Sequence, residues 1–189
     1  VLRYQCSPYH LNSALHPFIE QFEFLAGFSR DDSPDQKLDK MEAVLVGSAA
    51  QMAGAAPLFA AVLSLPTDRY PSLKLSPQRQ KEKTLESLAG QIEARARQGP
   101  VLMLFEDVHW VDPSSQELLD VLLPTLQELP VLLVTTHRPE HSPPWAGHRG
   151  HPFQAAGGRY AQVGAGTDRF RRIPTAGGPA DGHDLTCCV

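Results

Sequence analysis

The chain has 189 residues, a formal net charge of -4 at pH 7 and a sequence pI near 6.0. This balance excludes the strongly basic surface typical of nucleic-acid-binding domains. The length suffices for one domain with a hydrophobic core. The three cysteines, two of them adjacent at Cys187 and Cys188, form no disulfide or zinc pattern, so we expect a reducing, cytoplasmic setting. No apolar run reaches the roughly 18–20 residues that cross a bilayer, and we expect no membrane partner.

The first half of the chain predicts one short strand followed by helices. Val1–Tyr4 is a β-type run, and apolar residues at helical spacing follow from Leu15 to Ala26. Three later helices are each predicted from a capping side chain followed by proline, which presets the backbone of the first helical residue. These pairs are Ser33-Pro34, Ser76-Pro77 and Asp112-Pro113. The helix after Ser76 should end near Gln98, before Gly99.

The segment after Gly99 predicts a parallel sheet. Val101–Phe105 and Val131–Val134 are continuous apolar runs, a pattern typical of parallel strands buried on both faces. A helix is predicted between them, from Pro113 to Leu129. Strand, helix and strand at this spacing indicate an α/β fold.

Two adjacent carboxylates, Glu106 and Asp107, end the first of these strands. Ligands of open α/β sheets bind at that edge. A carboxylate there can hold Mg²⁺ through water, and a second can orient the attacking water in phosphoryl transfer. The residues alone leave a simpler interpretation open, in which the two acids are the polar end of a strand and Asp112 is only a helix cap.

The string Glu106–Pro113 resembles the Walker B segment of the STAND and AAA-like signalling ATPases, in which an acid pair precedes a His/Gln-Trp-x-Asp string. Thr135–Pro139 resembles the end of strand 4 in that family, and Arg3–His10 the segment after strand 2. The nearest resemblance, over about 1–145, is to the ATPase region of bacterial adenylate/guanylate cyclase-ATPase fusion proteins. It implies a partial P-loop NTPase-like fold containing parallel strands 2, 3 and 4 with flanking helices.

The resemblance also implies site residues and cofactors. Glu106 and Asp107 match the two Walker B acids and would hold Mg²⁺ and act in catalysis, with the metal assigned to either residue. Thr136 or Arg138 would lie where a sensor contacts the γ-phosphate of ATP, although Arg138 could equally be a solvated loop charge. His109 and Trp110 are expected to pack beneath the adjacent helix.

The phosphate-binding pattern G-x-x-x-x-G-K-[ST] is absent, because none of the five lysines follows a glycine. By resemblance it would precede Val1, and the family's first strand would lie beside Val131–Val134. We therefore expect that strand edge to be unpaired, the chain to be poorly soluble and the chain alone to be inactive.

The last part of the chain has a different composition. Nine of the 14 glycines lie in 141–189, where Leu185 is the only leucine. Such a segment buries too little apolar area to offset its chain entropy. We expect residues 1–145 to form the partial ATPase domain and residues 146–189 to be a disordered Gly/Pro/Arg-rich tail. A shifted reading frame and a genuine flexible tail are both open explanations of this tail.

Two functions from different classes follow. The first is a signalling ATPase module that, when intact, binds and hydrolyses ATP with Mg²⁺ and regulates flanking domains, such as a cyclase or a helical repeat. The second is a non-catalytic scaffold that has lost nucleotide binding. Cyclase or DNA-binding chemistry would belong to a domain outside these residues.

Overall fold

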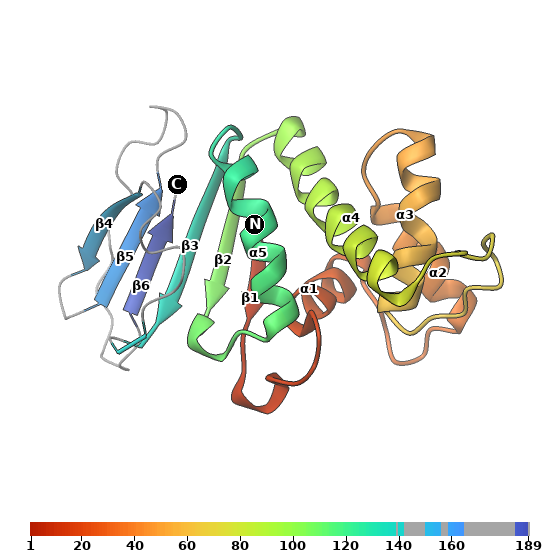
Figure 1. Cartoon of the computed structure of the whole chain (residues 1–189), viewed down its shortest axis with the longest axis horizontal. Helices are drawn as coiled ribbons and strands as arrows, with labels where there is room; N and C mark the ends of the chain where they lie inside the picture. Colours follow the sequence, from red (N-terminus) through yellow and green to blue (C-terminus); the bar gives the residue numbers. More distant parts are fainter. Residues whose placement is uncertain (139, 142–149, 156–158, 165–183, 189) are drawn as a thin grey trace.

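The computed structural model of the chain describes residues 1–138, 140–141, 150–155, 159–164 and 184–188, the last three ranges as backbone alone. Its main sheet contains the parallel strands β1 (Leu2–Gln5), β2 (Val101–Glu106) and β3 (Val131–His137) in that spatial order. Helices α4 (Pro77–Gln98) and α5 (Pro113–Leu126) cross one face of these strands (Figure 1). The predicted α/β fold with three parallel strands and flanking helices is confirmed.

The helix starts follow the predicted capping pattern. Ser33 caps α2 (Pro34–Val44) in a full capping box with Gln36, Ser76 caps α4, and Asp112 caps α5. Helix α1 (His16–Ala26) carries Pro17 in its first turn, where the missing N–H costs least. Helix α5 ends at Leu126, three residues before the predicted Leu129, and tolerates Pro124 in its last turn.

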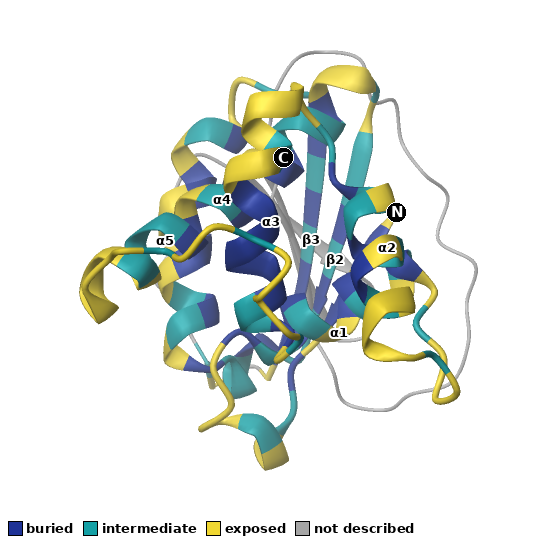
Figure 2. Cartoon of the chain, turned by 90° about the vertical axis from the view of Figure 1, so that its right-hand side faces the viewer, coloured by how far each residue is buried: buried dark blue, intermediate teal, exposed yellow. Residues whose placement is uncertain are grey.

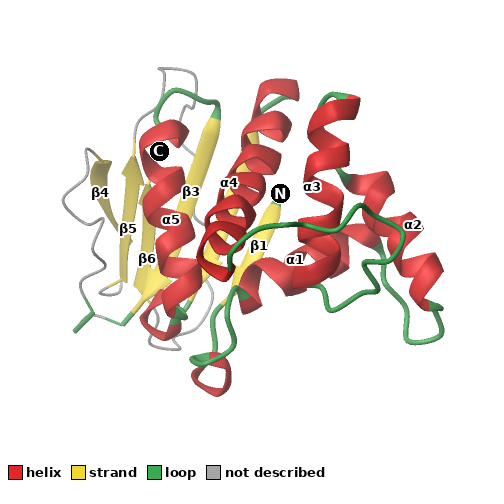
Figure 3. Cartoon of the chain, turned by 45° about the vertical axis from the view of Figure 1, so that its right-hand side comes forward, coloured by secondary structure: helices red, strands yellow, loops and turns green. Residues whose placement is uncertain are grey.

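Helix α3 (Ala49–Val62) was not predicted, because Pro57 interrupts the apolar run in its interior. Its start carries a recognisable signal nonetheless. Ser48 and Gln51 form a second capping box, with the Ser48 hydroxyl accepting from the Gln51 N–H at 3.3 Å. Figure 3 shows α3 lying next to α2 and α4, and α3 contacts both helices.

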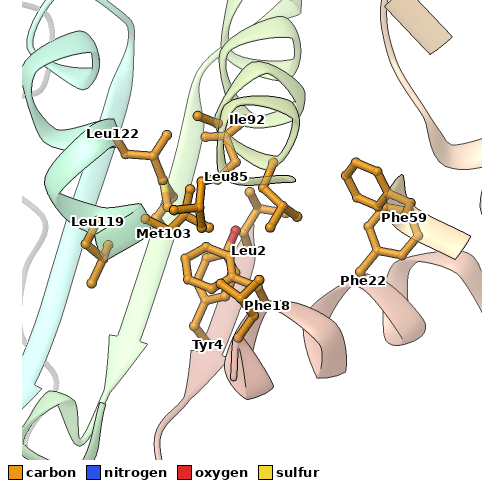
Figure 4. Packing of buried hydrophobic residues seen from close by; sticks show 14 of the residues in the cluster. Leu2, Tyr4, Phe18, Phe22, Phe59, Leu85, Ile92, Met103, Leu119 and Leu122 are labelled. Carbon is orange, nitrogen blue, oxygen red and sulfur yellow. The ribbon is translucent and has the colours of Figure 1, made fainter. Parts of the chain in front are cut away.

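The hydrophobic core lies between the sheet and the helices. Met103 and Phe105 of β2 are fully buried, and Tyr4 of β1 stacks on Phe105 with ring centroids 4.6 Å apart. Phe18 of α1 completes this aromatic group, 4.7 Å from Tyr4 (Figure 4). These contacts fix the relative positions of β1, β2 and α1.

The two faces of β2 are buried to different extents, which the continuous apolar run did not predict. Met103 and Phe105 face the helices, whereas the alternate residues Leu102 and Leu104 are only half-buried. Figure 2 shows the same alternation along β2 and β3. The composition of a strand therefore did not reveal which of its faces the helices cover.

The outer edge of β3 is not unpaired, contrary to expectation. Strand β6 (Asp184–Cys188) pairs with it antiparallel, with Thr135 opposite Thr186. Strands β4 (Gly150–Ala155) and β5 (Arg159–Gly164) form a separate antiparallel pair. Backbone groups on an open edge attract any available strand, so pairing can occur without a marked sequence period. The expected disorder of 146–189 concerns residues that lie largely outside the described ranges.

Within the described residues, no helix combines the length and apolar character needed for a membrane crossing.

Candidate active site

The two carboxylates lie where β2 ends, between the ends of β1 and β3. Glu106 is the last residue of β2 and lies opposite Gln5 of β1. Its carboxylate forms an ion pair with the Arg3 guanidinium, and the Glu106 side chain is 22% exposed. The hydrogen bond and charge of Glu106 raise the pKa of Arg3. The first acid is therefore already paired with a cation.

The second acid, Asp107, adopts a left-handed backbone with φ 57° and ψ 42°. Aspartate tolerates this region better than most residues, but a non-glycine residue is uncommon there. The Asp107 N–H donates to the Thr136 hydroxyl of β3 at 2.8 Å, and the Gln5 amide donates to the Asp107 carboxylate at 3.1 Å. Side chains from both neighbouring strands thus contact the same residue.

A short 3-10 turn, η2 (Val108–Trp110), follows the acids. Val108 is fully buried, and Trp110 is half-buried and packs against the core. The Arg138 guanidinium lies over the Trp110 ring, 5.3 Å from its centroid. Arg138 is therefore held at the same end of the sheet as the acid pair.

Asp112 has a larger role than the predicted helix cap. It is 1% exposed, and its carboxylate accepts from the N–H groups of Ser114 and Ser115 at 3.1 and 3.0 Å and from the Ser115 hydroxyl at 2.5 Å. It also accepts from the N–H of Leu15 at 2.9 Å, at the start of α1. Leu15 has a left-handed φ of 59°, which no sequence signal indicated.

Cys6 is buried directly after β1. Its N–H donates to the Glu106 carbonyl at 2.9 Å. Burial, reinforced by the negative charges of Asp112 and Asp107, raises the pKa of the Cys6 thiol to about 12. Cys6 is thus a neutral packing group behind the acids at neutral pH.

The donor set fits Mg²⁺. Mg²⁺ prefers hard oxygen ligands and is commonly held by one or two carboxylates together with water and substrate phosphates. Glu106 and Asp107 supply two carboxylates at one sheet edge, although a metal at Glu106 would compete with Arg3. Among the residues with described side chains, no cluster of three or more His, Cys, Asp or Glu residues suited to a metal is found.

The predicted site residues therefore gather at one place, with different surroundings. Glu106, Asp107 and Thr136 are linked through β1 and β3, and Thr136 is buried with its hydroxyl accepting from Asp107. Arg138 is exposed, with its guanidinium over the Trp110 ring. The sequence did not reveal the contributions of Arg3 and Gln5 or the contact of Asp112 with Leu15, because each joins residues far apart in the chain.

Comparison with known proteins identifies related sequences. The profile of the family described as "AAA ATPase domain" matches residues 1–134. An uncharacterized protein of Rhizobium meliloti (strain 1021) is 31% identical over 146 residues, which cover 77% of this chain and 14% of that protein. The matched segment of the chain thus spans about one seventh of the length of this relative. No solved structure shows a significant match.

Proposed function

The chain belongs to the AAA ATPase domain family, and we propose that it supplies the metal- and water-binding acids of a module that hydrolyses ATP. The observation that carries this proposal is the position of Glu106 and Asp107 at the carboxyl end of the central parallel strand, bonded to both neighbouring strands. Ligands of open α/β sheets bind at that edge.

Glu106 and Asp107 have complementary roles in this proposal. When bound, Mg²⁺ would neutralise charge on the phosphate oxygens. Glu106 would contribute a carboxylate to it after release from Arg3. Asp107, whose backbone is fixed by Thr136, would orient the attacking water and accept its proton. The assignment of metal and water between the two acids can be reversed.

Thr136 and Arg138 would lie on the γ-phosphate side. The Thr136 hydroxyl accepts from Asp107 and can still donate its own hydrogen. The Arg138 guanidinium is exposed at the same sheet end and can donate to phosphate oxygens. Since the sequence contains no Gly-Lys phosphate loop, we propose that the 189 residues alone do not hydrolyse ATP, and that the loop is supplied by a longer protein.

We also propose that ATP hydrolysis has a regulatory role in the longer protein. In this role, hydrolysis changes the conformation of the attached domains. The resemblance of residues 1–145 to the ATPase region of bacterial adenylate/guanylate cyclase-ATPase fusion proteins favours a nucleotide cyclase among those domains. The matched segment is 14% of the Rhizobium relative, so the rest of that protein is long enough to contain further domains.

The test uses the complete coding sequence, obtained by sequencing the gene on both sides of the Val1–Val189 segment. The expressed protein is assayed for Mg²⁺-dependent ATP hydrolysis as wild type, Glu106→Gln, Asp107→Asn and Asp31→Asn. The first two should lower kcat by about 100-fold or more, in the range of general acid–base and metal-binding contributions. Asp31, an exposed carboxylate on the loop before α2, is the matched control and should leave kcat unchanged.

A non-catalytic scaffold is the second candidate, favoured by the Arg3–Glu106 ion pair, which occupies one acid. In that case the complete protein would lack G-x-x-x-x-G-K-[ST], and its ATP turnover would be at background in all four forms. Wild-type turnover that both acid variants retain would refute the ATPase roles of the acids.

A further inference from the structure

The contact between Trp110 and Arg138 joins two separate chain segments at the acid-bearing edge. Trp110 follows β2, and Arg138 follows β3. The guanidinium carbon lies 5.3 Å from the indole centroid, which is within the range of a cation–π interaction. No carboxylate lies within ion-pair distance of Arg138 among the described residues, so the guanidinium there contacts the π face of Trp110 rather than an acid.

Trp110 is well fixed beneath the guanidinium. The backbone N–H of Trp110 donates to the Asp107 carbonyl at 2.8 Å, and the backbone N–H of Val111 donates to the Val108 carbonyl at 3.1 Å. Hydrogen bonds therefore hold the turn both at Trp110 and at the residue that follows it. The Trp110 ring packs against the core. The backbone of Arg138 is also held, because its carbonyl accepts from the His141 N–H at 3.0 Å.

This arrangement leaves the binding atoms of the arginine available. The indole presents a π face and no oxygen acceptor to the guanidinium, so the contact with Trp110 does not occupy the five guanidinium N–H groups in conventional hydrogen bonds. Those N–H groups match the geometry of two phosphate oxygens. A long exposed arginine would otherwise lose side-chain entropy on binding an anion, and the indole removes part of that loss beforehand.

We propose that Trp110 is a positioning residue that holds Arg138 with its in-plane N–H groups available to a phosphate group at the acid-bearing edge. Within the proposed function, on which this inference rests, the phosphate belongs to the nucleotide. Thr136 and Arg138 then tie the end of β3 to the loop after β2 at two points, through Asp107 and through Trp110.

The first measurement is of geometry and needs no ligand. The Arg138 Nε–H signal of the full 189-residue chain is identified in ¹H–¹⁵N spectra by its loss in Arg138→Gln. The indole ring current should displace this proton signal to lower frequency. Trp110→Leu should abolish the displacement and Trp110→Phe should retain part of it, whereas Phe24→Leu, which removes a ring 80% exposed on α1, should have no effect.

The second measurement is of binding, with magnesium pyrophosphate as the probe in the same spectra. Arg138→Gln should weaken binding by about tenfold, as expected for the loss of a charge-assisted hydrogen-bond pair. Trp110→Leu should weaken it by about three- to tenfold, and Trp110→Phe should restore it to within about twofold, because phenylalanine retains a cation–π face. Arg30→Gln, an exposed arginine elsewhere, should not change it.

If Trp110→Leu fails to fold, Trp110→Phe still tests the inference. In that variant the Arg138 Nε–H signal should be displaced less than in the wild type, while pyrophosphate binding stays near normal. An undisplaced Arg138 signal in the wild type, absence of pyrophosphate binding, or equal binding by wild type and a folded Trp110→Leu would each overturn the inference. Failure of the proposed function is recognised separately, as unchanged ATP turnover in the Glu106 and Asp107 variants of the complete protein.

Discussion

Replacing Asp112 should destabilise the chain far more than replacing another helix-capping residue. In Asp112→Ala, α5 loses its cap, which costs about 0.5–2 kcal/mol. The buried N–H of Leu15 also loses its acceptor at 2.9 Å, and stranding such a group costs about 1–3 kcal/mol. We therefore expect the free energy of unfolding to fall by about 2–4 kcal/mol, a large share of the roughly 5–15 kcal/mol typical of a domain.

Two further variants separate the causes. Asp112→Asn keeps the oxygen that accepts all three N–H groups, so its cost should stay below about 1 kcal/mol. Ser33→Ala removes an exposed cap that also precedes a proline and should cost about 1 kcal/mol. Urea unfolding followed by circular dichroism measures all three. A cost for Asp112→Ala no greater than that of Ser33→Ala would refute the importance of the Leu15 contact.

Three other predictions concern the surroundings of the acids. Thr136→Val removes the acceptor of the Asp107 N–H and should cost about 1–3 kcal/mol. The adjacent Thr135→Val should be neutral or stabilising in the same urea assay, because the buried Thr135 hydroxyl has no partner among the described residues; equal losses in the two variants would contradict this reasoning. Asp107→Gly relieves a left-handed backbone, so it should change stability by less than about 1 kcal/mol despite losing the Gln5 contact, and a loss above that would show that φ is not strained. The Cys6 thiol, with its pKa raised to about 12, should react with iodoacetamide at pH 8.5 about 1000-fold more slowly in the folded chain than in urea, since only the thiolate reacts. Peptide mass spectrometry resolves Cys6 from the other cysteines, and rapid native labelling would show that the thiol is exposed.

Sequence signals that act within one turn predicted most of the helices and strands. Pairing between distant parts of the chain was not predicted. A cap and a proline at Ser33, Ser76 and Asp112 act within one turn, so sequence alone located three helix starts. The strand Val131–Val134 was predicted too short, because buried polar residues extend it to His137. Helix α3 was missed because Pro57 interrupts its interior and the capping box at Ser48 was not recognised.

The candidate site was predictable in its residue types and not in its contacts. Glu106 and Asp107 were found because acids at the end of an apolar strand are unusual. The partners of these acids were not, because Arg3 lies 103 residues from Glu106 and Gln5 lies 102 residues from Asp107. No local pattern encodes such distances, and only the parallel pairing of β1 with β2 brings these side chains together.

The alternation of side chains along β1 links the interior of the protein to its chemistry. Leu2 and Tyr4 point into the core, and Arg3 and Gln5 therefore point to the opposite face, toward the acids. A slip of one residue in the pairing of β1 with β2 would exchange the two sets, placing a guanidinium in the core and removing both polar contacts. Leu2 and Tyr4 thus fix the register in which Arg3 and Gln5 contact Glu106 and Asp107. A change in packing at Leu2 or Tyr4 would therefore alter the contacts of the two acids, although neither residue contacts the acids itself.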